Sequence, residues 1–473
     1  MNKEEKYQIS DLKHVIDSEI SFLLNRPLTD LPVTQITSPN LISKYEQMPI
    51  PKKGKGLRPV MDLLHREVLN SHYLPNHPRM FSFVPGPASQ LSWLTDILTS
   101  GHNIHASNFN NAPLPITIEH RLIHYLSTKI GFDPILSGGL FVSGGSMATL
   151  TAIVAGRDAT IAMSHLSKAT VYFTAQAHFS VAKAFHVAGF APSQRRHIPT
   201  SDDHTMDVSA LQAQIKQDIA DGYQPTMVVV TTGTTNTGAV DDLEAITQIA
   251  HQHDIWVHAD GAYGLSHIFT EEGRRLLKGI EAVDSVTWDA HKLLFQTYSC
   301  AMVIVKDKQH LLSSYSTGAE YLDDITNQHD ALEPEKLGIE LSRPPRGLKL
   351  WVTLQVLGEN EIKLRIEHGQ KMARYAGQQV EKMAHWTIVT PPQFSVVTFR
   401  YNDPKKTPEE NNQIMKYTSS RIAQSGYAIA YTTELNEQRV IRLCTINPET
   451  TTRDIDETLQ RLDQYVRDTM STP

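Results

Sequence analysis

The sequence predicts an α/β fold, with a mostly parallel central sheet in a large domain and a small α+β domain at the carboxyl end. Three observations predict it. Between about residues 110 and 310, short apolar runs alternate with segments of helical periodicity. A long helical run follows at 346–382, and strand-like runs around a single helix come after it. Continuous apolar strands that alternate with helices are typical of a parallel sheet covered on both faces.

The composition excludes several classes of protein. Apolar residues make up 40% of the 473 positions and charged residues 20%, as in globular domains. A net charge of −7 gives no general attraction to nucleic acid or to anionic membranes. The two cysteines exclude a disulfide scaffold, and the first 20 residues lack the apolar core of a signal peptide. We therefore expect a cytoplasmic protein that binds neither nucleic acid nor membrane.

The elements follow in order along the chain. Residues 1–60 are polar, Pro-interrupted and too poor in apolar residues for a core of their own, so we expect an arm that packs on another surface. Residues 61–350 are expected to form the large domain, 351–382 a connecting long helix and 383–473 the small domain. The strands expected in the large domain are 140–142, 171–174, 227–232, 255–258, 285–288 and 301–305, with helices at 208–220 and 243–252.

The small domain has its own signals. Strand-like runs at 386–389, 396–400 and 439–443 surround a helix that begins after Thr407. Thr407 and Glu410 have the spacing of a capping box, and Pro408 stands at the first helical position.

Four short motifs at strand ends carry the chemistry. Lys292 follows an expected strand and precedes three apolar residues, a setting that favours a neutral, nucleophilic amine. Asp260 ends another strand, where a buried carboxylate needs a partner. A Gly/Ser turn at 143–146 precedes a helix, whose first N–H groups make a cup for a phosphate. A hydroxyl-rich turn occupies 233–238. Taken singly, each motif is also compatible with an ordinary structural role.

Together these motifs match the requirements of pyridoxal 5'-phosphate (PLP). The cup would hold the phosphate, Asp260 would keep the ring nitrogen protonated, and Lys292, 32 residues later, would form the Schiff base. The turn at 143–146 matches neither a dinucleotide-binding nor a nucleoside-triphosphate motif. A zinc site built on His251 and His253 is not expected, because no third ligand follows at a suitable spacing.

The chain resembles the group II PLP-dependent amino-acid decarboxylases, which have the aspartate-aminotransferase fold (fold type I). The resemblance covers about residues 60–470 and is closest to bacterial aromatic amino-acid decarboxylases, tryptophan decarboxylase included. The motifs that carry it, in chain order, are 77–79, 81–89, 103–106, 143–146, 174–178, 233–235, 258–263, 289–292 and 346–358.

The resemblance implies a role for each matching residue. Lys292 would form the Schiff base, and Asp260 would bind the pyridine nitrogen. The other residues implied to hold the cofactor are Gly145, Ser146 and His291 at the phosphate, His178 and Ala262 on the two faces of the ring, and Thr235 and His258 along the ring and its hydroxyl side. The resemblance also implies a homodimer with the active site at the subunit interface.

Two departures from the family's pattern stand out. Leu293 replaces the tryptophan that usually follows the lysine, which changes the packing behind Lys292 but not its chemistry. The tyrosine that many members carry in a loop before the helix at 346 is missing near residues 333–334. Tyr321, earlier in the same segment, and His178 are therefore the candidate proton donors.

The substrate class follows from the segment 77–118, which the resemblance places at the substrate pocket. From residue 80 to 118 the only charge is Asp96, so an acidic substrate side chain would find no partner. The residues expected to contact the substrate are Phe81, Phe83, His105 and Trp351.

We expect PLP-dependent decarboxylation of an aromatic L-amino acid (Trp, Phe, Tyr or Dopa) to its amine. The alternatives are decarboxylation-coupled oxidative deamination to an aldehyde, and decarboxylation of a non-aromatic amino acid such as glutamate or aspartate. A selenocysteine- or cysteine-type lyase would keep the Asp and Lys but not the segment 77–79. A binding protein without catalysis would leave Lys292 without a purpose.

Overall fold

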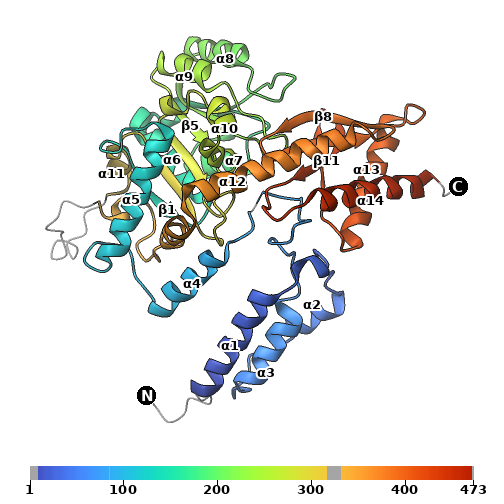
Figure 1. Cartoon of the computed structure of the whole chain (residues 1–473). Helices are drawn as coiled ribbons and strands as arrows, with labels where there is room; N and C mark the ends of the chain where they lie inside the picture. Colours follow the sequence, from blue (N-terminus) through green and yellow to red (C-terminus); the bar gives the residue numbers. More distant parts are fainter. Residues whose placement is uncertain (1–8, 85, 317–331, 471–473) are drawn as a thin grey trace.

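The computed structural model describes residues 9–84, 86–316 and 332–470, so the candidate proton donor Tyr321 lies outside the described residues. Three parts follow one another along the chain: helices at the amino end, a large α/β domain, and a small domain reached through a long helix (Figure 1). Among the described residues, none of the helices is both long and apolar enough to span a membrane.

The large domain is built on a seven-stranded sheet with the order β1-β7-β6-β5-β4-β2-β3. Only β7 runs antiparallel to its neighbours, and the other paired strands are parallel, which confirms the mostly parallel sheet. The sequence did not predict β3, because this edge strand is short and mostly polar. The strands are β1 (Gly138–Val142), β2 (Ala169–Thr174), β3 (Arg195–Ile198), β4 (Gln224–Thr231), β5 (Trp256–Asp260), β6 (Ser285–Asp289) and β7 (Ala301–Val305).

Helices cover both faces of this sheet. Alternate residues along a strand pack into two separate hydrophobic cores, one on each face. Val228 and Val230 of β4 pack against α5, α8, α9 and α12, whereas Met227 and Val229 pack against α6, α7 and α11. This burial on both faces explains the continuous apolar runs in the sequence. The helices are α4 (Gln90–His102), α5 (Pro113–Ile130), α6 (Gly145–Thr160), α7 (Phe179–Val187), α8 (Val208–Ala220), α9 (Leu243–His251), α10 (Glu271–Leu276), α11 (Gln309–Tyr315) and α12 (Leu348–Val380).

Shorter helical turns connect these elements. They are the 3-10 turns η1 (Leu28–Asp30), η3 (Met163–Lys168), η4 (Pro192–Gln194), η5 (Gly264–Phe269), η6 (Ile280–Ala282) and η8 (Pro334–Lys336), and the π-helical turn η2 (Leu64–Val68).

The small domain packs helices on an antiparallel sheet with the order β10-β11-β9-β8. The helix α12 leads into it and bends at Gly358, whose backbone has a φ of 77° and leaves the helical region. The capping box predicted at Thr407 is present: its hydroxyl accepts from the Glu410 N–H, and the Glu410 carboxylate accepts from the Thr407 N–H. The elements are β8 (Trp386–Gln393), β9 (Val396–Tyr401), α13 (Pro408–Gln424), β10 (Thr432–Leu435), β11 (Gln438–Cys444) and α14 (Thr452–Met470).

The amino-terminal helices α1 (Ile9–Asn25), α2 (Pro39–Glu46) and α3 (Leu57–Leu63) project away from the rest of the chain (Figure 1). The arm boundary expected at residue 60 falls inside α3, because the helical segment continues through the π-helical turn η2. Within residues 11–73, Val33 alone is buried, so this segment has no core of its own.

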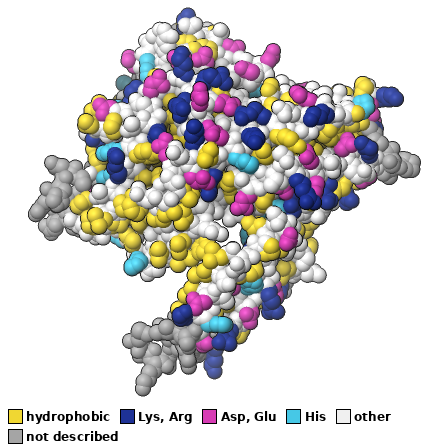
Figure 2. Space-filling view, viewed as in Figure 1, with side chains coloured by type: hydrophobic (Ala, Val, Ile, Leu, Met, Phe, Trp, Pro, Cys, Tyr) yellow, Lys and Arg dark blue, Asp and Glu magenta, His cyan; other side chains and the backbone are white. Residues whose placement is uncertain are grey.

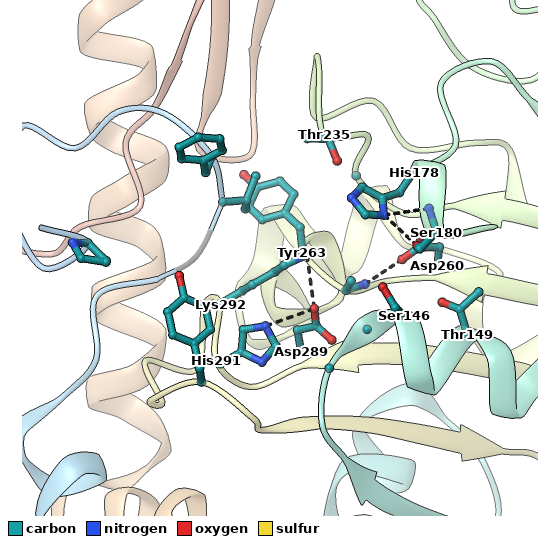
Figure 3. Close-up of a pocket in the computed structure, with 18 of the residues that line it drawn as sticks. Ser146, Thr149, His178, Ser180, Thr235, Asp260, Tyr263, Asp289, His291 and Lys292 are labelled. Atoms are coloured by element: carbon teal, nitrogen blue, oxygen red, sulfur yellow. Dashed lines mark hydrogen bonds and ion pairs between the residues drawn. The ribbon is translucent and has the colours of Figure 1, made fainter. Parts of the chain in front are cut away.

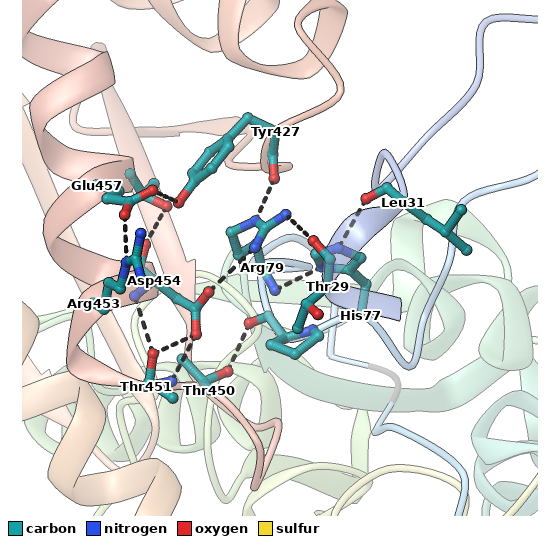
Figure 4. A network of polar contacts seen from close by, with 12 residues as sticks. Thr29, Leu31, His77, Arg79, Tyr427, Thr450, Thr451, Arg453, Asp454 and Glu457 are labelled. Carbon is teal, nitrogen blue, oxygen red and sulfur yellow. Dashed lines mark hydrogen bonds and ion pairs between the residues drawn. The ribbon is translucent and has the colours of Figure 1, made fainter. Parts of the chain in front are cut away.

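A polar network attaches this segment to the small domain (Figure 4). Arg79 donates to the Thr29 carbonyl oxygen and to that of Tyr427, and its guanidinium pairs with Asp454 at 3.3 Å. His77 reaches the Leu31 carbonyl oxygen, 3.2 Å away. The motif at 77–79 therefore joins the amino-terminal segment to the small domain.

Candidate active site

A cavity of about 700 Å³ lies between the carboxyl ends of the parallel strands and the small domain, where ligands bind in open α/β sheets. It collects residues from five strand ends, from the segment 73–84 and from β11 (Figure 3). The residues that line it are Tyr73, Pro75, Met80, Phe83, Val84, Ser143, Gly144, Gly145, Ser146, Thr149, His178, Ser180, Thr231, Gly233, Thr235, Asp260, Ala262, Tyr263, Asp289, His291, Lys292, Tyr298, Ser299 and Arg442.

One end of the cavity is the start of α6, directly after β1. The first N–H groups of a helix have no partner within it and carry the positive end of the helix dipole. The Ser146 side chain is exposed there and free to contact a ligand. A Cβ on Gly145 would stand 2.8 and 2.9 Å from the two carboxylate oxygens of Asp289, so only glycine allows this close approach.

Lys292 enters the cavity from the turn after β6. Its Nζ lies 3.3 Å from Oδ2 of Asp289, and its side chain is 22% exposed. Behind it, Leu293, Leu294 and Phe295 are buried in the large-domain core. The amine therefore combines an apolar setting with access to the cavity.

His291 stands beside the start of α6. Its Nδ1 lies 3.0 Å from the carbonyl oxygen of Cys300, which can only accept, so Nδ1 carries a proton. Its Nε2 lies 3.5 Å from Oδ2 of Asp289. Burial lowers the pKa of His291, while Asp289 acts in the opposite direction.

Asp260 and His178 lie close together on another side of the cavity. Asp260 ends β5, is 7% exposed and accepts from the Ala262 N–H at 3.2 Å. His178 caps α7: its Nδ1 accepts from the Ser180 N–H at 3.3 Å and lies 2.7 Å from the Ser180 hydroxyl. Because Nδ1 accepts a hydrogen bond, the neutral ring carries its proton on Nε2. Burial lowers the pKa of His178, which favours this neutral form, and Asp260 opposes that shift.

The turn after β4 completes the wall. Gly233 has a φ of 109°, and a Cβ there would stand 2.9 Å from the Cα of Gly264, so both the conformation and the packing require glycine. Arg442 of β11 donates to the Thr235 carbonyl oxygen at 2.5 Å. This contact joins the small domain to the turn of the large one.

The structure brings most of the sequence-predicted residues to this one cavity. Lys292, Asp260 and Phe83 line it, and so do the remaining cofactor candidates other than His258. These remaining cofactor candidates are Gly145, Ser146, His178, Thr235, Ala262 and His291.

Two of the predicted residues are buried away from the cavity. His258 is fully buried within β5, with its ring nitrogens 2.8 Å from the Ser285 hydroxyl and 3.2 Å from that of Thr287. Phe81 belongs to the core of the small domain and is also fully buried. The structure corrects both expectations, because neither side chain has any surface to offer a ligand.

Two further predicted residues also lie outside the cavity. Trp351 packs from α12 against the large-domain core. His105 is exposed, and its Nδ1 lies 3.2 Å from the Asn111 side-chain amide. Neither lines the cavity of this chain.

Sequence reasoning gave no role to several polar residues of the cavity, among them Asp289, Ser180 and Arg442. Arg442 left a readable signal, since a charged residue inside the otherwise apolar run of β11 must have a partner. No sequence pattern points to Asp289 or Ser180, apart from the closeness of Asp289 to Lys292 and of Ser180 to His178 along the chain.

The residues present fit PLP. The start of α6 offers N–H groups, a hydroxyl and a close-packed glycine to a phosphate. Asp289 Oδ1 is buried beside this turn and has no hydrogen-bond partner within the described part of the chain. A buried carboxylate, Asp260, is available for a protonated ring nitrogen, and Lys292 supplies an amine.

Comparisons with known proteins agree with this geometry. Residues 44–402 match the model of the pyridoxal-dependent decarboxylase conserved domain. An aromatic-L-amino-acid decarboxylase of Bacillus atrophaeus is 37% identical over 96% of this chain and 93% of its own length. A phenylacetaldehyde synthase of Arabidopsis thaliana is 27% identical over 91% of this chain and 90% of its own.

The fold is that of solved enzymes that use the same cofactor. The crystal structure of Oryza sativa TDC with PLP and tryptamine superposes with a TM-score of 0.93, at 24% identity, and the match covers all of both chains. The cavity, the family match over three quarters of the chain and this superposition lead to one conclusion: the chain belongs to the family of pyridoxal-dependent decarboxylases.

Proposed function

We propose that this enzyme converts an aromatic L-amino acid to its amine and CO₂. The observation that carries the proposal is the composition of the cavity, which places Lys292 and Asp260 beside a wall of aromatic side chains. Tyr73, Phe83 and Tyr298 line the cavity. Among the described residues that line the cavity, Arg442 is the only Lys or Arg apart from Lys292. The similarity to the Bacillus atrophaeus enzyme supports the same substrate class.

We assign the cofactor residues by their positions. Ser146, His291 and the N–H groups around Gly145 hold the phosphate, and Lys292 provides the amine that attaches PLP. Asp260 holds the proton on the ring nitrogen, because a buried carboxylate stabilises a nearby positive charge. His178 and Ala262 lie on the two faces of the ring, with Thr235 at its edge. When bound, PLP supplies an electron sink for the electrons that the departing carboxylate leaves behind.

The remaining groups orient the substrate. The Arg442 guanidinium uses one N–H on Thr235 and has others for the substrate carboxylate. The His178 Nε2–H points away from Ser180, toward the cavity (Figure 3), as a hydrogen-bond donor. Tyr321 remains our candidate for the group that returns a proton to Cα, with the neutral His178 as the rival.

The substrate ring packs on the aromatic wall. Phe83 and Tyr73 have ring centroids 6.2 Å apart and form one apolar surface at the cavity. Truncation of Phe83 to Ala should weaken selection of large aromatic substrates by about 1–3 kcal/mol, the usual effect of a few lost apolar contacts in a pocket. Glutamate and aspartate fit poorly, because Arg442 cannot serve both carboxylates of such a substrate.

The direct test is to incubate the purified enzyme with the twenty amino acids, Dopa and 5-hydroxytryptophan, and to measure CO₂, amine and aldehyde. We expect amine from one or more aromatic substrates and none from the Lys292→Ala enzyme. Aldehyde with ammonia, formed at the cost of oxygen, would instead indicate the decarboxylation-coupled deamination that the name of the Arabidopsis relative suggests. Faster decarboxylation of glutamate than of any aromatic amino acid would refute the proposal.

We further propose that the enzyme is a homodimer. Apolar side chains on the projecting amino-terminal helices are exposed, among them Leu23 and Leu24 of α1, and so are Ile97 and Leu98 of α4. Figure 2 shows hydrophobic side chains gathered near α4. A segment without a core of its own needs a second surface, and a stable dimer needs an interface well above about 1,000 Å². Ultracentrifugation should find a dimer; a fully active monomer would refute this.

The proposed location is the cytoplasm, because both cysteines, Cys300 and Cys444, are free and buried, as suits a reducing compartment. Fractionation of cells that produce the protein tests this.

A further inference from the structure

Asp289 places a buried carboxylate next to the proposed phosphate site. Its side chain is 4% exposed, and both of its oxygens would touch a Cβ at Gly145, so the carboxylate lies against the first turn of α6. Oδ1 has no hydrogen-bond partner among the described residues. A phosphate dianion bound at the same turn would therefore approach a negative charge, and like charges a few ångströms apart disfavour each other.

His291 makes the arrangement more unusual. Because its Nδ1 donates to the Cys300 carbonyl oxygen, the neutral ring has a lone pair on Nε2. This nitrogen faces Oδ2 of Asp289 at 3.5 Å. Two hydrogen-bond acceptors thus face each other, and a single added proton between them would turn this contact into a hydrogen bond.

Other charged groups near Asp289 do not remove the repulsion between its carboxylate and a bound phosphate. Lys292 lies 3.3 Å from Oδ2, but in the proposed function its amine is used to attach PLP. Lys349 of α12 acts on His291 but is held by Asp96 and by the Tyr298 carbonyl oxygen. His178 and Asp260 approach from the ring side of the cavity, where burial lowers the pKa of His178.

We propose that binding of the phosphate group takes up one proton from solvent, which Asp289 and His291 hold between Oδ2 and Nε2. The proton neutralises the carboxylate or charges the imidazole, and either result removes the repulsion of the phosphate. Asp289 thus acts as a positioning residue that links cofactor affinity to pH. The proposal rests on the assignment of the phosphate to the start of α6.

The test measures proton uptake by the full chain freed of PLP. Inorganic phosphate is the ligand, because it has neither ring nor aldehyde and does not react with Lys292. The Lys292 ammonium that stays 3.3 Å from Asp289 in this test balances one negative charge and leaves the phosphate dianion uncompensated. Calorimetry at about pH 8, where free phosphate is mostly a dianion, in buffers of different ionisation enthalpy should show uptake of about one proton. The Kd of phosphate should rise about tenfold per pH unit above this pH, as one linked proton requires.

Asp289→Asn keeps the shape of the side chain and removes its charge. In this variant we expect almost no proton uptake and a phosphate Kd that does not change with pH. Asp260→Asn is the matched control, a carboxylate of the same cavity on the ring side, and should retain the uptake. Ser146→Ala should weaken phosphate binding about tenfold, the effect of one hydrogen bond to a charged group, with uptake unchanged.

These measurements distinguish proton uptake at Asp289 and His291 from the assignment of the phosphate to the start of α6. If Ser146→Ala binds phosphate as tightly as the wild type, the phosphate is not at the start of α6, and both statements fail. If Ser146→Ala weakens binding but the wild type takes up no proton, the site stands and the inference is overturned. If Asp289→Asn takes up as many protons as the wild type, the inference is overturned as well. If Asp289→Asn does not fold, the wild-type pH dependence decides alone.

Discussion

Gly86 has a contact that explains why a glycine stands before α4, and its replacement gives the sharpest prediction. A Cβ at this position would lie 1.7 Å from the Lys292 carbonyl oxygen and 2.7 Å from its carbonyl carbon. Real Cβ atoms essentially never come closer than 3.0 Å to a neighbour, so in Gly86→Ala the two backbones must separate by about 1.3 Å, the difference between 3.0 and 1.7 Å.

Neither backbone can move alone. The Lys292 N–H donates to the Asp289 carbonyl oxygen, and the Lys292 carbonyl oxygen accepts from the Phe295 N–H. The Ser89 N–H in turn donates to the Phe295 carbonyl oxygen, which ties the segment after Gly86 to the same loop. The strain therefore reaches the lysine. Displacement of a reacting group by about 1 Å can cost a factor of about 100 in rate, and overpacking costs about 1–3 kcal/mol of stability.

The assay compares kcat/KM for the best substrate, the visible absorbance of bound PLP and the thermal midpoint. Gly86→Ala should lose about 100-fold in kcat/KM and a few degrees in the midpoint. The control is Gly101→Ala in α4, where a Cβ has nothing within 4 Å. It should be neutral, or slightly stabilising because alanine favours helix. Wild-type kinetics and stability in Gly86→Ala would refute the reasoning.

Three further predictions follow. Asp260→Asn should keep PLP bound through its phosphate yet lower turnover by orders of magnitude, since the ring nitrogen loses the charge that holds its proton; near-normal turnover would contradict this. Glu119→Gln should cost about 3–5 kcal/mol in urea unfolding, because buried Arg343, 2.8 Å away, loses its ionic partner, whereas the exposed pair of Glu367 should matter little in Glu367→Gln. Burial lowers the pKa of His77 from 6.5 to about 4, so the folded state keeps it neutral and stability falls as the pH drops from about 6.5 toward 4. His77→Gln should flatten that part of the stability profile, and parallel profiles would show that His77 does not contribute.

The sequence predicted the fold where burial left a strong pattern. The strands β4 and β5 are buried on both faces, and their apolar runs placed them within about three residues. The strand β10 was missed, as β3 was, because it lies at a sheet edge and only Leu435 of its residues is buried. Edge strands keep one side in solvent and need no continuous apolar run, so their sequences resemble loops.

For the site, the residues that follow strand ends could be predicted, but the depth of a side chain within a strand could not. His258 and Asp260 stand two residues apart, so both point to the same face of β5. The cavity begins only at the last residue of the strand, and one pleat further back the same face is covered by α6. There Thr149 and Thr287 lie 3.1 Å apart, and Thr287 contacts His258. The two-residue alternation of a strand predicts which face of the sheet a side chain lies on. It does not predict how far along the strand the covering helix α6 extends.

The same limit applies to the aromatic residues before α4. Phe81 and Phe83 are also two residues apart, yet Phe81 lies in the small-domain core and Phe83 lines the cavity. The segment is not a regular strand: Phe83 has a φ of 65°, in the left-handed region, which redirects its side chain. The Phe81 N–H donates to the Ile429 carbonyl oxygen, and the Phe81 carbonyl oxygen accepts from the Cys444 N–H. Contacts 348 and 363 residues away in the sequence therefore fix its place. Which aromatic ring lines the cavity is thus decided by the docking of the small domain, and the local sequence does not predict it.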